Sequence, residues 1–158
     1  MQAYYSLCQS HLTYGNLGWG GTHKTLLDKL QKTQKLILKI IFHRPHLYPT
    51  TLLFSESKVL DVRQLYIKNT LMHFHQHLDQ AQRRLHSHNT RSQSLILPPR
   101  MNTSFGQRHY SFLASKFFNK LPENKKSLHA KCKFKKEVHK WIQEMGNQAS
   151  EQLLTIQR

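Results

Sequence analysis

Residues 23–43, HKTLLDKLQKTQKLILKIIFH, decide the fold class of this chain. Apolar side chains recur every three or four residues in this stretch, which is the pattern of a helix with one buried face. The predicted buried face consists of Leu26, Leu27, Leu30, Gln34, Ile37, Leu38 and Ile41. We expect Thr22 to be the N-cap, and we expect the helix to end before Pro45, because the residue that precedes a proline disfavours helical geometry.

A glycine-rich segment, 15-GNLGWGGT-22, precedes this helix. Its spacing resembles the nucleotide-binding loop G-x-x-x-x-G-K-[ST], but Gly21 occupies the position of the lysine. Residues 2–15 have helical spacing, whereas a phosphate-binding loop follows a strand. We therefore expect a turn between two helices, with Gly15 ending the first helix and Trp19 packed inward. The amides at the start of the second helix can still attract a phosphate.

Apolar spacing predicts further helices over residues 51–57, 61–77, 110–121 and 127–145. Their expected starting signals are Thr50, Asp61 with Gln64 as a capping box, and Ser127. Residues 95–100, LILPPR, suit an edge strand or an extended piece. The predicted fold class is mostly α: a small helical bundle, a basic loop with a short extended segment, and two further helices. The predicted regions are residues 1–78, a basic linker at 79–109, a helical region at 110–146 and a polar tail at 147–158.

The charge of the chain is strongly positive, with 24 Lys and Arg residues against 8 Asp and Glu residues. Fifteen of the basic residues and four of the acidic ones follow residue 79. Such an excess favours a polyanionic partner, and nucleic acid is the commonest. An ordinary solvated surface and an anionic membrane surface are the alternatives.

Arginines interleaved with aromatic residues indicate an RNA surface in the second half, because guanidinium groups bind phosphates and rings stack on unpaired bases. The aromatic residues concerned include Phe105, His109 and Tyr110. The alternative for the lysine-rich run at 131–140 is a solvated helix face. The predicted phosphate contacts are Lys24, Lys32, Arg91, Arg100, Arg108, Lys131, Lys135 and Lys136.

No catalytic residue, metal ligand or cofactor is predicted. The carboxylates are scattered, and no D-D or D-x-D element is present to hold the two magnesium ions of a polymerase or nuclease. His73 and His77 lie one helical turn apart, without an evident third ligand. Cys8 and Cys132 are too few for a disulfide framework. No apolar run approaches 18 residues and no secretory signal is recognisable, so we expect an intracellular chain, nuclear or cytoplasmic.

Several short motifs occur in an order that resembles a known family. The first is S-H-L-x-Y-G at residues 10–15, followed by Trp19 and Gly20 and by the Leu–Gln helix ending in Ile40, Ile41 and Phe42. The others are H-S-H-N-T-R at residues 86–91, Phe118, Asn119, Leu121 and Pro122 in the pattern W-N-x-L-P, and Phe134, Lys135 and Lys136. Together, over residues 2–145, they resemble the region after the polymerase core of LINE-type (non-LTR) retrotransposon reverse transcriptases. His88 and Phe118 depart from the tyrosine and tryptophan of that family's pattern.

The resemblance implies a thumb-like helical bundle beside a template–primer duplex, in a family of RNA-directed DNA polymerases. It implies RNA or RNA–DNA duplex, and the missing polymerase core, as partners. The F/Y-x-D-D box of that family has no counterpart here. We therefore expect a non-catalytic C-terminal fragment of such an enzyme, whose glycine-rich segment is a helix–turn–helix connection. The alternative is a small protein–protein interaction module with incidental basic charge.

Overall fold

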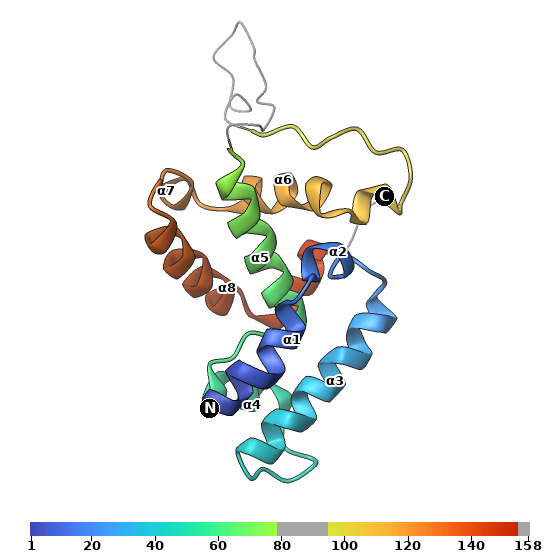
Figure 1. Cartoon of the computed structure of the whole chain (residues 1–158), viewed down its shortest axis with the longest axis vertical. Coiled ribbons are helices and arrows are strands. Elements are labelled where there is room, and N and C mark those ends of the chain that lie inside the picture. Colours follow the sequence, from blue (N-terminus) through green and yellow to red (C-terminus); the bar gives the residue numbers. More distant parts are fainter. Residues whose placement is uncertain (79–94, 155–158) are drawn as a thin grey trace, which may run out of the picture.

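The computed structural model describes residues 1–78 and 95–154, and it consists of helices joined by short turns (Figure 1). The first half contains η1 (Tyr4–Gln9, a π-helix), α1 (Ser10–Thr13), α2 (Asn16–Trp19), α3 (Lys24–Ile41), α4 (Thr50–Ser57) and α5 (Val62–Gln76). The second half contains η3 (Gly106–Arg108, a 3-10 turn), α6 (Tyr110–Lys120), α7 (Glu123–Lys126) and α8 (Lys131–Leu154). The described residues form no strand, and the mostly α prediction is confirmed.

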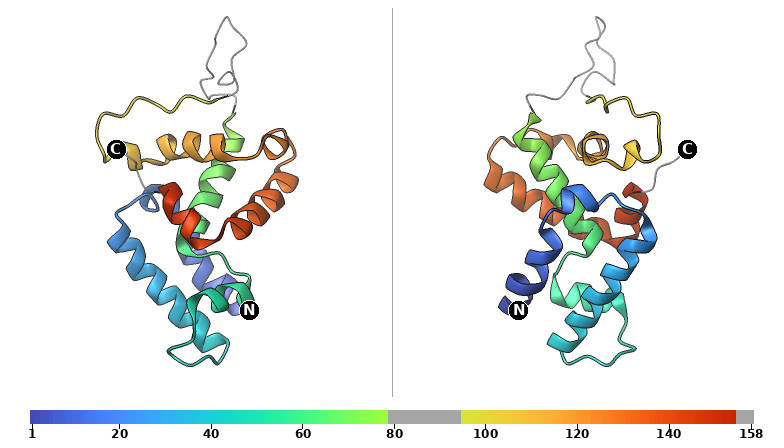
Figure 2. Two further views of the ribbon diagram at one scale, coloured as in Figure 1. Left: turned by 180° about the vertical axis from the view of Figure 1, so that it is seen from behind. Right: turned by 45° about the vertical axis from the view of Figure 1, so that its right-hand side comes forward.

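Helix α5 runs through the middle of the molecule, with α6 and α8 packed against it and the N-terminal helices on its other side (Figures 1 and 2). Helix α5 buries Ile67, Thr70 and Leu71 in addition to Val62 and Leu65. A helix that is covered on several sides buries more than one stripe.

Two apolar clusters form the core. The larger joins α5, α6 and α8 and is built from Leu65, Ile67, Leu71, Leu113, Phe117, Phe134, Val138 and Ile142, among others. The smaller joins η1, α3 and α4 and is built from Tyr4, Leu38, Leu53, Phe54 and Val59. Residues 1–78 therefore share the larger core with the C-terminal helices.

The buried face of α3 differs from the prediction. Leu27, Gln31, Gln34 and Leu38 are buried, whereas Leu26 and Leu30 are 51% and 37% exposed. The glutamines are tolerated inside because their amides are paired: Gln31 Nε2 donates to Asp61 Oδ2 at 3.2 Å, and Gln34 Nε2 donates to the Tyr4 hydroxyl at 2.7 Å. Polar partners on neighbouring elements thus decide which stripe of α3 faces inward.

Three predicted helix starts need correction and one is confirmed. Helix α3 begins after His23 rather than at a Thr22 cap, and Thr50 is the first residue of α4, after Pro49. Ser127 ends α7, so α8 begins only at Lys131. The capping box of α5 is present: Asp61 Oδ1 accepts from the Gln64 amide at 2.7 Å, and Gln64 Oε1 accepts from the Asp61 amide at 3.1 Å.

The glycine-rich segment is a turn that contains the single-turn helix α2. Gly15 adopts the predicted left-handed conformation, with φ of 60°. Trp19 is only half-buried, and its Nε1 donates to the Tyr14 carbonyl at 2.9 Å, while Asn16 is the fully buried residue. A Cβ atom on Gly20 would lie 2.2 Å from the Tyr66 ring. The turn therefore needs glycine in order to pack against α5.

Residues 95–100 are extended, as predicted, but they form no strand. Their anchor is Ile96, whose amide donates to Asn119 Oδ1 at 3.0 Å and whose carbonyl accepts from Asn119 Nδ2 at 2.9 Å. Of the basic linker predicted at 79–109, residues 79–94 lie outside the described residues. Residues 147–154, within the predicted polar tail, are helical; Gly146, with φ of 75° and ψ of 178°, separates them from the first part of α8.

Candidate nucleic-acid interface

The first turns of α8 carry a surface that is rich in cations. Phe134, Val138 and Ile142 are buried in the core and fix the rotation of the helix. The side chains between them in sequence consequently point outward. We define the α8 basic face as Lys131, Lys133, Lys135, Lys136, His139 and Lys140, together with Lys68 of the adjoining helix α5.

The α8 lysines of this face are exposed, Lys68 is partly buried, and only one acid lies within residues 131–140. That acid, Glu137, forms an ion pair with Lys125 of α7, with 2.8 Å between Lys125 Nζ and Glu137 Oε2. Because of this pair, the pKa of Glu137 lies below its usual value and the carboxylate stays charged. Glu137 therefore mainly neutralises a lysine of α7, and its interaction with Lys140 of the α8 basic face is the weaker one.

Lys68 joins this face from α5. Its Nζ donates to His139 Nδ1 at 3.4 Å. Burial, and then the nearby charge of Lys135, lower the pKa of Lys68. Burial and the charge of Lys68 lower the pKa of His139 in the same way. The lowered pKa values mean that each group is harder to protonate than in water. This is expected where cations are partly buried next to one another and no acid lies between them.

The structure brings together only part of the predicted phosphate-binding set. Lys131, Lys135 and Lys136 share the α8 basic face, but α3 lies across the molecule from the first turns of α8 (Figures 1 and 2). Lys32 is exposed on α3, and Arg100 is exposed in the extended segment. Arg91 lies outside the described residues.

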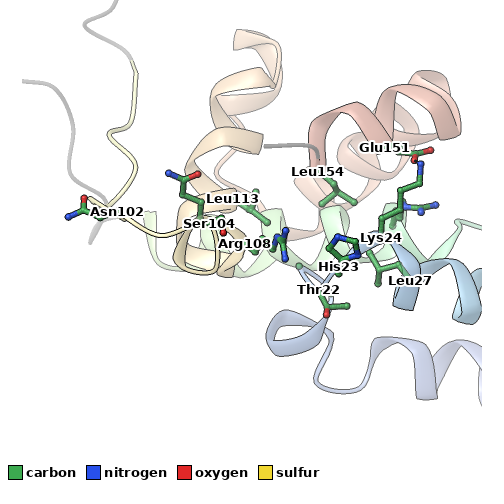
Figure 3. A pocket seen from close by; sticks show the side chains of 14 residues that line it. Thr22, His23, Lys24, Leu27, Asn102, Ser104, Arg108, Leu113, Glu151 and Leu154 are labelled. Carbon is green, nitrogen blue, oxygen red and sulfur yellow. Dashed lines mark ion pairs between the residues drawn. The ribbon is translucent and has the colours of Figure 1, made fainter. Parts of the chain in front are cut away.

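Lys24 and Arg108 meet at a different place, a pocket of about 490 Å³ beside the glycine-rich turn (Figure 3). We call it the α3–η3 pocket. Residues 20–24, Leu27, Arg63, Asn102, Ser104, Gln107, Arg108, Leu113, Glu151 and Leu154 line it. Lys24 forms an ion pair with Glu151, which the second part of α8 carries to this point. Arg63 is held within the wall by Asp28 and Gln31.

The histidines of α5 and the two cysteines do not assemble into a metal site in the described part of the chain. The His73 and His77 rings lie 4.7 Å apart, but no group of three or more His, Cys, Asp or Glu side chains is gathered among residues 1–78 and 95–154. Cys8 and Cys132 are both free thiols. Among the described helices, none has the length and apolar character needed to cross a bilayer.

Sequence reasoning missed Lys68 and His139 as members of the basic face. Lys68 is an isolated lysine between Ile67 and Asn69 of α5, and its sequence context carries no signal for a cation cluster. Only the packing of α5 on α8 places it there. His139 could have been found, because it follows Lys131 and Lys135 at four-residue spacing, which puts the three on one side of a helix. No protein-family model, curated protein or solved structure matches this chain.

Proposed function

We propose that this chain binds RNA or an RNA–DNA duplex through the α8 basic face, without catalytic chemistry of its own. The observation that carries the proposal is the segregation of charge on α8. Five lysines of the first ten residues stand on the surface, and the one acid among them is paired elsewhere. Nucleic acid is the polyanion that such a helix fits best, because its phosphates repeat along a surface.

The cations of the α8 basic face are lysines and one histidine, without an arginine, which indicates contact with the phosphate backbone rather than with bases. Lysine is a flexible point charge, whereas base edges are read by forked or planar groups. Binding through lysines holds a strand or a duplex in place and carries no sequence information. This agrees with the resemblance to the region beyond the polymerase core of non-LTR reverse transcriptases, which implies contact with a template–primer duplex.

The carboxylates support a binding role rather than a polymerase role. Glu56 accepts from Arg44 and Tyr48, Asp61 caps α5, and Asp28 pairs with Arg63. Of the seven acids in the described residues, only Glu144 has no such partner. The chain thus offers no pair of available carboxylates for two magnesium ions in the described part. We expect primer extension with magnesium to give no nucleotide incorporation, and incorporation would contradict this proposal.

The direct test compares two double charge reversals that change the net charge equally. Lys135→Glu/Lys136→Glu removes two members of the α8 basic face, and Lys29→Glu/Lys120→Glu alters two exposed lysines elsewhere. Fluorescence anisotropy with a labelled RNA–DNA duplex and with single-stranded RNA measures the affinity. We expect the first variant to lose roughly tenfold or more at low salt, and the control to lose far less. Equal losses would mean that net charge alone, and not this face, governs binding.

A second function, binding of a protein partner, is favoured by the outer stripe of α3. Leu36 and Ile40 are 49% and 65% exposed, next to the exposed Leu26 and Leu30. Lysines flank this stripe, while the one acid of α3, Asp28, is paired with Arg63. A second copy of the chain would oppose lysine to lysine there, so charge complementarity favours an amphipathic helix whose apolar seam has acidic flanks.

The protein-binding candidate can be tested separately from nucleic-acid binding. The probes are two synthetic helical peptides with the same leucine seam, one flanked by glutamates and one by lysines. We expect only the glutamate peptide to bind, and we expect Leu36→Ser/Ile40→Ser to abolish that binding without changing RNA affinity. Binding that survives this substitution, or concentration-dependent dimerisation that it removes, would contradict the acidic partner.

A further inference from the structure

We infer that the α3–η3 pocket binds a nucleotide, meaning one nucleoside with its phosphate, supplied either free or as the 5′-phosphorylated end of an RNA strand. The inference deepens the proposed nucleic-acid binding and rests on it for the second source of ligand. The pocket is separate from the α8 basic face, and its volume of about 490 Å³ lies within the usual range for small-molecule sites.

The cationic side of the pocket offers two groups to a phosphate. No described residue forms a hydrogen bond or ion pair with the Arg108 guanidinium, and Figure 3 shows it within the pocket, on the side facing His23 and Lys24. Lys24 is engaged by Glu151, but that pair is largely exposed, so a phosphate can compete for the ammonium group. Guanidinium and ammonium groups together suit a terminal phosphate, which carries more charge than a phosphate inside a strand.

Arg63 lies in the wall without being a direct ligand, because its guanidinium is already paired with Asp28. Its side chain is buried, with its nitrogens donating to Gln31 Oε1 and Asp28 Oδ1, each at 2.5 Å. Among the described residues that line the pocket, Glu151 is the only carboxylate. With Lys24 paired to Glu151 and Arg63 paired to Asp28, Arg108 still leaves the described lining with a net positive charge.

The remaining walls suit the nucleoside. Leu27, Leu113 and Leu154 supply apolar surface, and Asn102 and Ser104 supply amide and hydroxyl groups at the opposite end from Lys24 (Figure 3). An apolar surface with a few polar groups at one end and cations at the other matches a base, a ribose and a phosphate in turn. Inorganic phosphate alone would leave the apolar walls without a contact.

The glycine-rich turn contributes by its shape. Gly20 and Gly21 line the pocket, and the backbone of Arg108 packs directly on Gly21. This contact holds η3 beside the start of α3 and so sets the separation of Arg108 from Lys24. The turn thus builds a nucleotide-sized pocket without the lysine of a nucleotide-binding loop.

The test measures the binding of AMP to the full chain by isothermal titration calorimetry. Inorganic phosphate is the comparison ligand. Arg108→Gln should weaken AMP binding about ten- to a hundredfold, because a charged hydrogen bond to phosphate is lost, while the matched Arg100→Gln should have no effect. Glu151→Gln should strengthen AMP binding several-fold, because it releases Lys24, while the exposed Glu144→Gln should not. AMP binding that is absent, or unchanged in both pocket variants, would overturn the inference.

The two sources of ligand are separated with an oligoribonucleotide carrying either a 5′-phosphate or a 5′-hydroxyl. A preference for the phosphorylated strand that Arg108→Gln removes would identify the strand end as the ligand, and AMP binding without this preference would identify a free nucleotide. Lys135→Glu/Lys136→Glu should leave AMP binding unchanged. Loss of duplex binding in that variant together with unchanged AMP binding would show that the two sites are independent, so either proposal can fail alone.

Discussion

Gly21 lies directly against the carbonyl oxygen of Arg108, and a Cβ atom built on Gly21 would be 2.1 Å from that oxygen. No side chain fits at this distance without moving one backbone away from the other. Residues 87 positions apart in the sequence are thereby joined, and the N-terminal helices are tied to the start of the C-terminal ones. This contact explains why position 21 holds a glycine and not the lysine of a nucleotide-binding loop.

Gly21→Ala should destabilise the protein by about 1–3 kcal/mol, because the added methyl group must displace η3. Gly18→Ala is the matched control: Gly18 has helical geometry and no atom within 4 Å of an added Cβ. Urea unfolding measures both. The control should be neutral or slightly stabilising, because alanine favours a helix over glycine. Equal stability of the two variants would mean that the Gly21–Arg108 contact is not tight in solution.

Asn119→Ala should destabilise the protein by about 1–3 kcal/mol, because Ile96 would keep a buried side chain while its amide and carbonyl lose their partners. Asn124→Ala, at an exposed position in α7, is the control. Hydrogen exchange at the Ile96 amide gives a local measurement. It should accelerate in the Asn119 variant and stay slow in the control, and slow exchange in both would exclude the role assigned to Asn119.

Removing one lysine from the α8 basic face should reduce the salt dependence of RNA–DNA duplex binding. If six to ten phosphates are contacted, raising salt from 50 to 200 mM lowers the affinity by roughly 10³–10⁵. Lys135→Gln should then reduce the slope of log K against log salt by about 1, whereas Lys29→Gln should leave it unchanged. Binding that is insensitive to salt would contradict a phosphate interface altogether.

His139 should make the folded protein less stable as the pH falls below 6.5, which is the ordinary pKa of a histidine side chain. Its pKa in the folded state is lowered by burial and by Lys68, so the unfolded chain binds the proton more readily than the folded chain in this range. Stability therefore rises with pH through that window. His139→Gln should lose less stability than the unchanged protein between about pH 7.5 and about pH 5.5, measured by urea unfolding.

The same histidine should strengthen nucleic-acid binding on acidification, because a bound phosphate favours its charged form. Duplex affinity should rise as the pH falls over the same range, and His139→Gln should reduce this rise. As the pH falls, stability should decrease and duplex affinity should increase. A histidine that only packs in the fold would change stability without changing duplex affinity. If His139→Gln changes neither the pH dependence of stability nor that of duplex affinity, His139 does not belong to the interface.

Much of the helical structure follows from local patterns in the sequence. The apolar period of residues 23–43, the Asp61–Gln64 capping box, the left-handed Gly15 and the helix predicted over residues 110–121 each depend on groups within a few residues of one another. The lysines of residues 131–140 could likewise be assigned to one helix that presents them outward. Interactions between near neighbours along the chain need no knowledge of the rest of the fold.

The tertiary structure alone decided which surfaces face inward and which side chains meet. The burial of Gln31, together with the exposure of Leu26 and Leu30, was not predicted; Gln31 is held inside by Asp61, which reaches α3 only after the chain folds back. Lys68 joins the α8 basic face through helix packing, and Lys24, Arg108 and Glu151 meet in one pocket from three distant segments. Burial and electrostatics depend on distance in space, so groups brought together by folding cannot be read from their separation along the chain.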